Sequence, residues 1–183
     1  MAYKSWKDIP GEVPPQDTEL LIQIVESLPK DAIIVELGTC LGSSGVAMAQ
    51  ASRGTKRKLF LVDNFDPVGH KERGGWVMPS RELLEQNLAD CGVRSRCEIL
   101  EGNSAEIGVN WNGPAIDFLF IDADHSFNGV TNDLASWASH VKKGGTIALH
   151  DYNNDHVKVK DAAFQFFGRF PDRIHWLTGV YVL

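Results

Sequence analysis

The residues best suited to chemistry form two short clusters of carboxylates and imidazoles. The first is Asp122-Ala123-Asp124-His125 and the second is His150-Asp151. Each cluster directly follows a short apolar run, at 118–121 and at 146–149. Carboxylate oxygens together with an imidazole can hold a hard or borderline divalent ion, which lowers the pKa of a bound hydroxyl. An imidazole can also act as a general base, because it titrates near neutral pH.

These clusters yield two sets of predicted site residues. We predict Asp122, His125 and His150 as catalytic residues. For a metal site we predict Asp122, Asp151 and His150, with His125 as the alternative imidazole. Magnesium, manganese and zinc all fit this ligand set, so the ligand types do not choose among them. A purely structural interpretation stays open, in which Asp124 caps the next helix and His150 packs at the sheet edge.

A glycine-containing loop follows the first apolar run of the chain. It reads Glu36-Leu37-Gly38-Thr39-Cys40-Leu41-Gly42-Ser43-Ser44-Gly45. Glycine at 38 and 42 allows a sharp turn and a close approach of the backbone to a ligand, and the start of the following helix offers unpaired N–H groups. Taken alone, the loop is also typical of an ordinary turn between a strand and a helix.

Asp63 gives this loop a functional partner. It ends the second apolar run, where an acid can accept hydrogen bonds from both hydroxyls of a ribose. Loop and acid together predict a nucleoside site. After the third apolar run, Glu101-Gly102-Asn103-Ser104 places small polar groups where they can meet an adenine edge, although a plain Asn/Ser turn is an equally good interpretation.

Short apolar runs predict the strands that position these residues. Their continuous apolar character indicates strands covered on both faces. They cover 32–35, 59–62, 97–100, 118–121 and 146–149. Helical patterns at 44–51, 81–89 and 130–141 lie between them, the last closed by Gly144-Gly145. A helix before the first strand is predicted with Asp17 as its cap and an end near Pro29.

This order of elements predicts the fold class. Alternating strands and helices imply an α/β fold with a doubly wound, mostly parallel, Rossmann-like sheet. A later helix at about 155–167 precedes runs at 174–177 and 180–183. With a tight turn at Thr178-Gly179, these runs predict an antiparallel C-terminal edge. Ligands bind outside the carboxyl ends of the strands in such sheets, so the polar clusters are expected along one edge.

Composition narrows the classes of partner. The 183 residues, 43% of them hydrophobic, predict one domain over 1–183. The net charge of −6, with no Lys/Arg run longer than 56–58, argues against nucleic acid. Cys40, Cys91 and Cys97 form no C-x-x-C pair, which favours a reducing compartment. No signal-like segment and no long apolar run occurs, so we expect a cytoplasmic protein without a membrane partner.

The motifs together resemble those of class I S-adenosylmethionine-dependent methyltransferases, in particular the small bacterial O-methyltransferase type of methyltransferase family 24. The matching segments are Glu36–Ser44, Asp63, Asp122–Phe127, and Lys142–Gly145 before His150-Asp151. The resemblance covers about residues 15–155. It implies S-adenosylmethionine as cofactor, with Gly38 along the methionine moiety, Asp63 on the ribose, and Asn103-Ser104 beside the adenine.

The resemblance also implies a reaction. A methyl group would pass from S-adenosylmethionine to an oxygen, or alternatively a nitrogen, of a small-molecule acceptor. The similar catechol-type O-methyltransferases use a metal site whose first two carboxylates match Asp122 and Asp151, but their next residue, Asn, is Tyr152 here. The predicted cofactor-binding residues are Glu36, Gly38, Thr39, Gly42, Ser43, Asp63, Asn64, Asn103, Ser104 and Asp122.

Other readings of the sequence remain open. The long loop 65–79, with His70 and Trp76, is predicted as a lid. A nicotinamide-dependent oxidoreductase is one alternative, but the spacing Gly38-x-x-x-Gly42-x-x-Gly45 departs from G-x-G-x-x-G. A non-catalytic ligand-binding protein on the same fold is another. The acceptor and the oligomeric state, including a homo-oligomer, are left open.

Overall fold

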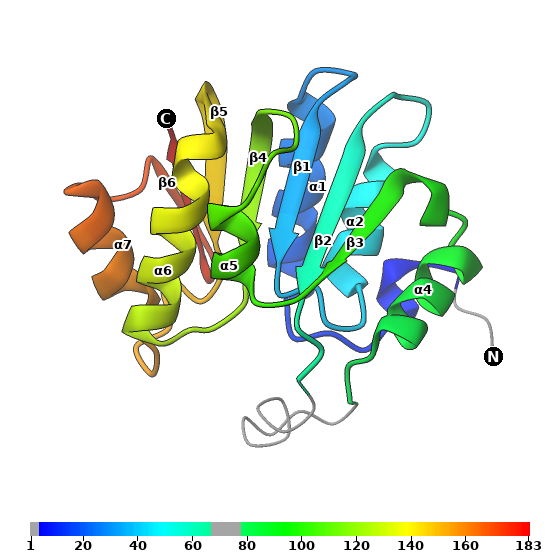
Figure 1. Cartoon of the computed structure of the whole chain (residues 1–183), viewed down its shortest axis with the longest axis horizontal. Coiled ribbons are helices and arrows are strands. Elements are labelled where there is room, and N and C mark those ends of the chain that lie inside the picture. The colour runs from blue at the N-terminus through cyan, green and yellow to red at the C-terminus, as the bar shows by residue number, and fades with distance from the viewer. Residues whose placement is uncertain (1–3, 67–77) are drawn as a thin grey trace.

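The computed structural model describes residues 4–66 and 78–183, with a seven-stranded sheet at its centre (Figure 1). The strand order is β3-β2-β1-β4-β5-β7-β6. The strands are β1 Ile33–Leu37, β2 Lys58–Asp63, β3 Cys97–Glu101, β4 Ile116–Ile121, β5 Val141–Leu149, β6 Arg173–His175 and β7 Thr178–Val182. Strands β1 to β5 are parallel, whereas β7 runs antiparallel to β5 and β6 antiparallel to β7. The predicted doubly wound sheet with an antiparallel edge is confirmed.

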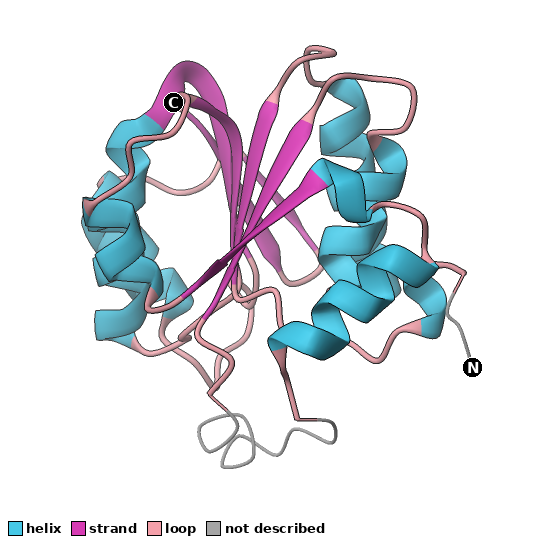
Figure 2. Cartoon of the chain, turned by 45° about the vertical axis from the view of Figure 1, so that its right-hand side comes forward, coloured by secondary structure: helices cyan, strands magenta, loops and turns pink. Residues whose placement is uncertain are grey.

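Helices cover both faces of this sheet (Figure 2). One face packs against α1, α2 and α4, and the other against α5, α6 and α7. Their bounds are α1 Pro15–Ser27, α2 Ser43–Ala51, α4 Arg81–Asp90, α5 Ser104–Val109, α6 Phe127–Trp137 and α7 Val159–Phe167. None of the helices in the described part of the chain is both long and apolar enough to cross a membrane.

The two-sided cover explains why the central strands β1 and β4 have no exposed face. Ile34 enters the core beneath α1 and α2, and its neighbour Val35 enters the core beneath α6 and α7. Phe118 and Leu119 divide in the same way on β4. Because successive side chains point to opposite faces, a strand covered twice buries nearly every side chain, and most of these side chains are therefore apolar.

The predicted cap of the first helix is wrong. Pro14 is the N-cap of α1, and Pro15 is its first residue. Asp17 lies within the first turn with its side chain fully buried, where Oδ2 accepts a hydrogen bond from the Leu177 N–H at 3.3 Å. A contact with the C-terminal part of the chain, and not a local cap, holds this carboxylate.

The predicted end of the helix before β5 is also wrong. Helix α6 ends at Trp137, and the chain enters β5 at Val141. Val141 pairs with Ile116 of β4, whereas the next paired residue of β5 is Thr146. Gly144, at φ +79°, lies in this irregularity. The glycines therefore permit a bulge inside a strand, which uses the same left-handed backbone as a helix end.

The turn at the antiparallel C-terminal edge is not where the sequence predicted it. Thr178 and Gly179 belong to β7, and the turn before them contains Trp176 at φ +49°. A Cβ at Gly179 would lie 2.6 Å from the ring of Tyr152. This glycine is required by packing within the sheet and not by a turn. Helix α7 begins at Val159, later than expected, and the short α5 stands where only a turn was expected.

Arg57 connects the end of α1 to the sheet. Its guanidinium group is buried. It donates hydrogen bonds to one backbone carbonyl in the last turn of α1 and to two that follow the helix. Nε reaches the Pro29 carbonyl at 2.9 Å and Nη2 reaches the Glu26 carbonyl at 3.2 Å and the Leu28 carbonyl. The last carbonyls of a helix have no partner inside the helix, so one side chain here satisfies several of them.

We expect Arg57→Lys to lower the free energy of unfolding by about 1.5–3 kcal/mol. Lysine keeps the charge but cannot serve these carbonyls with a planar fork of donors, and each charge-assisted hydrogen bond contributes about that range. Urea unfolding at neutral pH measures the effect. Lys58→Arg, at the exposed neighbouring position, is the matched control, and equal stability of the two variants would contradict the prediction.

Candidate active site

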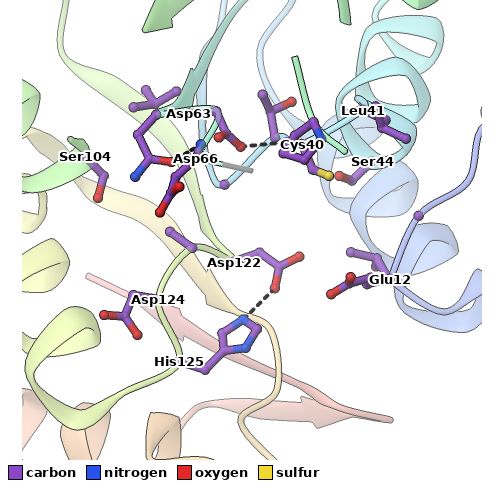
Figure 3. Close-up of a pocket in the computed structure, with 18 of the residues that line it drawn as sticks. Glu12, Cys40, Leu41, Ser44, Asp63, Asp66, Ser104, Asp122, Asp124 and His125 are labelled. Carbon is purple, nitrogen blue, oxygen red and sulfur yellow. Dashed lines mark hydrogen bonds and ion pairs between the residues drawn. The ribbon is translucent and has the colours of Figure 1, made fainter. Parts of the chain in front are cut away.

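A cavity of about 640 Å³ opens at the carboxyl ends of the parallel strands (Figure 3). It lies where the strand order reverses between β1 and β4, which is the expected position for a ligand in this fold. Residues that follow five strands line it, and the segment 10–13 adds a further wall. The lining includes Gly38, Thr39, Ser43, Asp63, Asn64, Asn103, Ser104, Asp122, His125 and Asp151.

Gly38 allows the loop after β1 to lie against the chain after β4. Its φ is +86°, and a Cβ there would lie 2.2 Å from the backbone oxygen of Asp122. The Asp122 N–H donates to the Leu37 carbonyl at 2.9 Å. Any side chain at position 38 would separate the two strand ends. Gly42, also at φ +86°, is the N-cap of α2 and lies behind the cavity wall.

Glu36 supports this loop from behind. Its carboxylate accepts hydrogen bonds from the hydroxyls of Thr39 at 2.9 Å and Ser44 at 2.5 Å. The side chain is fully buried, and burial raises the pKa of Glu36 to about 7. Glu36 is not among the residues that line the cavity, so its predicted part in cofactor binding would act through Thr39 and Ser44.

Asp63 fixes two turns while it faces the cavity (Figure 3). Oδ2 accepts the backbone N–H of Cys40 and Oδ1 accepts that of Phe65, each at 2.7 Å. Cys40 and Phe65 both have φ +50°, a conformation that costs free energy for residues other than glycine. The carboxylate therefore holds two strained turns, and each of its oxygens has a second lone pair left for a ligand.

The two clusters of carboxylates and imidazoles meet in space. His125 Nε2 lies 3.1 Å and His150 Nδ1 lies 3.0 Å from the same oxygen of Asp122. His125 Nδ1 lies 3.3 Å from Oδ2 of Asp151. Parallel pairing brings them together, because Ile121 and Leu149 are in register on β4 and β5.

Electrostatics make this cluster a set of mutually stabilising ions. Burial disfavours a charged Asp122, but His150 and His125 outweigh burial and lower the pKa of Asp122 to about 2. Burial likewise disfavours a charged His150, but Asp122 and Asp151 raise the pKa of His150 to about 10. The pKa of His125 is also raised, against its burial, by Asp122 and Asp151. At neutral pH both carboxylates are therefore ionised and His150 is protonated.

The two histidines have different access to the cavity. His125 lines it, whereas the side chain of His150 is 3% exposed and lies behind Asp122. Ligand atoms of Asp122, His125 and Asp151 all lie within 4.8 Å of one another, a group that could hold a metal ion. The imidazole in this group is that of His125, which the sequence analysis named as the alternative to His150. His150 Nδ1 is 3.6 Å from Asp151 and contacts the group from its buried side.

Sequence reasoning missed two supporting residues. Asp17 lies 3.7 Å from His150 Nε2, on the side of the ring opposite Asp122. Asn154 lines the cavity and donates its side-chain amide to Asp151 at 2.9 Å. Tyr152, which stands where the similar enzymes have Asn, is buried against Tyr181 instead. The sequence contains no spacing signal for Asp17, because a carboxylate in a first helical turn usually indicates a local cap.

The predicted lid lies largely outside the described residues. Residues 67–77, which include His70 and Trp76, are in that part of the chain. Asp66 and Pro79 on either side of it line the cavity. Among the described lining residues there are six carboxylates and no Lys or Arg. The cavity therefore favours a ligand that carries positive charge.

The fold and the cavity define an α/β enzyme class that binds a nucleoside cofactor, with a glycine-containing loop after β1 and an acid at the end of β2. A family model described as a methyltransferase domain, that of methyltransferase family 24, matches residues 35–152. The chain belongs to this family and is a methyltransferase. The match includes both clusters of carboxylates and imidazoles. It argues against the alternative that the chain is a nicotinamide-dependent oxidoreductase.

Known proteins resemble the chain at low sequence identity. The uncharacterized protein R132 of Acanthamoeba polyphaga mimivirus is 28% identical over 161 residues, 84% of this chain and 69% of that protein. The O-methyltransferase NovP superposes with a TM-score of 0.77 at 17% identity over 91% of this chain and 79% of that one. An O-methyltransferase from Bacillus cereus, in complex with SAH, gives a TM-score of 0.64 at 18% identity, over 88% and 72%. The solved structures establish the likeness of fold.

Glu36 predicts a pH dependence of stability. Its folded pKa of about 7 lies above the ordinary value of 4.5, so the unfolded chain releases this proton first and stability declines as pH rises from 4.5 to 7. We expect Glu36→Gln to gain about 2–3 kcal/mol relative to the wild type between pH 5 and pH 8. Urea unfolding at both pH values, with Glu98→Gln on the exposed side of β3 as control, measures it. A pH-independent difference would refute the assignment.

Proposed function

We propose that this methyltransferase transfers a methyl group from S-adenosylmethionine to an oxygen of a small molecule. The observation that carries the proposal is the single cavity that joins the Gly38 loop and Asp63 to the Asp122–His125–Asp151 cluster. One end has the features of a nucleoside site and the other has ionised groups suited to a hydroxyl. The Bacillus cereus neighbour, in complex with SAH, supports the choice of cofactor.

Charge and backbone geometry suit one end of the cavity to the cofactor. S-adenosylmethionine carries a sulfonium and an ammonium group, and the six lining carboxylates favour both. The absence of a side chain at Gly38 leaves the backbone of the loop close to the cavity. Asp63 accepts ribose hydroxyls in this proposal, while Asn103 and Ser104 approach the base. Thr39, Ser43 and Asn64 complete the wall.

The reaction end performs a displacement. The acceptor oxygen attacks the methyl carbon, the carbon–sulfur bond breaks, and the hydroxyl proton passes to the neutral form of His125, which gives a methyl ether, S-adenosylhomocysteine and a protonated imidazole. Most of the rate comes from holding the oxygen in line with the methyl group at short distance. Asp122 and His125 orient the hydroxyl and take part in removing its proton, while His150 holds Asp122 from the buried side.

A divalent cation fits the same cluster. Two carboxylates and one imidazole are a donor set for magnesium, manganese or zinc, and their ligand atoms are close enough to share an ion. A bound cation would lower the pKa of the acceptor hydroxyl. Asn154 would orient Asp151 as a ligand through its 2.9 Å hydrogen bond. His125 must then be neutral, so cation binding is expected to release protons.

Asp63→Ala is expected to weaken binding of S-adenosylhomocysteine by about 10- to 100-fold. This corresponds to the loss of charge-assisted hydrogen bonds to the ribose, about 1.5–3 kcal/mol. Isothermal titration calorimetry on the folded variant gives the dissociation constant. Asp31→Ala, an exposed carboxylate just before the opposite end of β1, is the control. An affinity equal to that of the wild type would mean that the ribose lies elsewhere.

Asp151→Ala is expected to abolish manganese binding measured by electron paramagnetic resonance of the free ion at neutral pH. The substitution removes one of the two carboxylates in the cluster, which are the strongest ligands for a hard cation. Asp161→Ala, on the exposed face of α7, is the control. It changes the net charge by the same amount as Asp151→Ala but leaves the cluster intact. If the wild type and both variants leave the same concentration of free manganese, the cluster holds no metal, and proton removal depends on Asp122 and His125 alone.

A further inference from the structure

The end of β3 presents two side chains whose hydrogen-bonding roles are already half used. Asn103 is the N-cap of α5, and its Oδ1 accepts the Glu106 N–H at 3.1 Å. Ser104 Oγ donates to Oδ1 of Asp133 on α6 at 2.6 Å. Asn103 and Ser104 both line the cavity. What each side chain can still offer a ligand is therefore fixed by its protein partner.

For Ser104 the remaining role is that of an acceptor. A hydroxyl has one proton, and an ionised carboxylate can only accept, so the Ser104 proton belongs to Asp133. For Asn103 the remaining role is that of a donor, because its oxygen faces the helix and its NH₂ group does not. The wall thus presents a donor at 103 next to an acceptor at 104.

The position of these groups relative to Asp63 indicates which part of a nucleoside they meet. Asp63 pairs with Glu101 across β2 and β3, and the Gly102 N–H donates to the Asp63 carbonyl at 2.9 Å. Asn103 and Ser104 come next in the chain. A base attached to a ribose at Asp63 therefore reaches the donor and acceptor of this wall.

We infer that Asp133 is a positioning residue that makes the cavity selective for adenine. Adenine presents an acceptor at N1 beside the donor NH₂ group at C6, which complements a donor at Asn103 and an acceptor at Ser104. Hypoxanthine presents N1–H and a carbonyl oxygen, which reverses both roles and mismatches the wall. The inference rests on the proposed cofactor and adds the residue that determines the polarity of the base site.

The burial of Asp133 favours this function over a purely structural one. Its side chain is 2% exposed, and burial raises the pKa of Asp133 to about 6. Its second oxygen, Oδ2, has no hydrogen-bond partner among the described residues. Burying a carboxylate with one hydrogen bond is costly, and the Trp137 Nε1–H already ties the start of α5 to α6 through the Ser104 carbonyl at 2.9 Å. A neutral residue would suffice for packing alone.

The test compares affinity for S-adenosylhomocysteine with affinity for S-inosylhomocysteine by calorimetry. We expect the wild type to prefer the adenine compound by at least about 5-fold, the lower limit for mismatched polar groups. In Asp133→Leu the Ser104 hydroxyl is free to donate to the carbonyl of hypoxanthine. The preference should then shrink at least 3-fold, and the affinity for S-inosylhomocysteine should rise, which general damage to the fold cannot cause.

Two further variants keep the inference falsifiable. Ser104→Ala should reduce the preference, because it removes both the acceptor for the adenine NH₂ group and the lone pair that opposes the hypoxanthine carbonyl. This expectation holds whether or not Asp133→Leu folds. Ser136→Ala changes the same helix at a hydroxyl bonded to the Asn132 and Asp133 carbonyls, and it should keep the wild-type ratio. A wild type without preference, or a ratio unchanged in Ser104→Ala or in folded Asp133→Leu, overturns the inference alone. A wild type that binds neither compound overturns the proposed cofactor as well.

Discussion

The contact between Gly38 and the backbone of Asp122 is the constraint on which the site depends. A Cβ at position 38 would lie 2.2 Å from the Asp122 oxygen, so the two strand ends meet because one of them has no side chain. This contact joins the loop that we propose faces the cofactor to the cluster that we propose faces the acceptor. Methyl transfer needs the two reactants in line at short range. If the ends of β1 and β4 were further apart, the enzyme would bind the cofactor and the acceptor without aligning them.

Charge balance is the second requirement of the cluster. Asp122, Asp151 and Asp17 surround His150, and Asp122 and Asp151 also contact His125. Each group alone would resist burial, but the carboxylates and imidazoles stabilise one another's charged forms. Asp122 consequently remains an acceptor at any pH at which the protein is expected to work. The carboxylates keep the pKa of His150 near 10, so in the absence of a cation His150 is a fixed donor and His125 is the imidazole that meets the ligand.

Several residues of the wall serve the fold and the ligand at once. Asn103 caps α5, and Asp63 holds two left-handed turns. A side chain that already has a protein partner has a fixed orientation, so it meets a ligand with little further loss of entropy. The same fixation determines polarity at Ser104, where the partner, Asp133, comes from the neighbouring helix α6.

The sequence by itself determined the sheet and the edge of it at which the candidate site lies. Continuous apolar runs such as 118–121 predict strands covered twice, and parallel strands place the residues after them, Asp63 and Asp122 among them, at one edge. Only the tertiary structure decided that Asp17 faces His150, that Gly144 forms a bulge, that His125 and not His150 lines the cavity, and that Asp133 holds Ser104. These facts depend on side chains from elements distant in the chain, and local spacing carries no information about which distant partner a buried polar group will find.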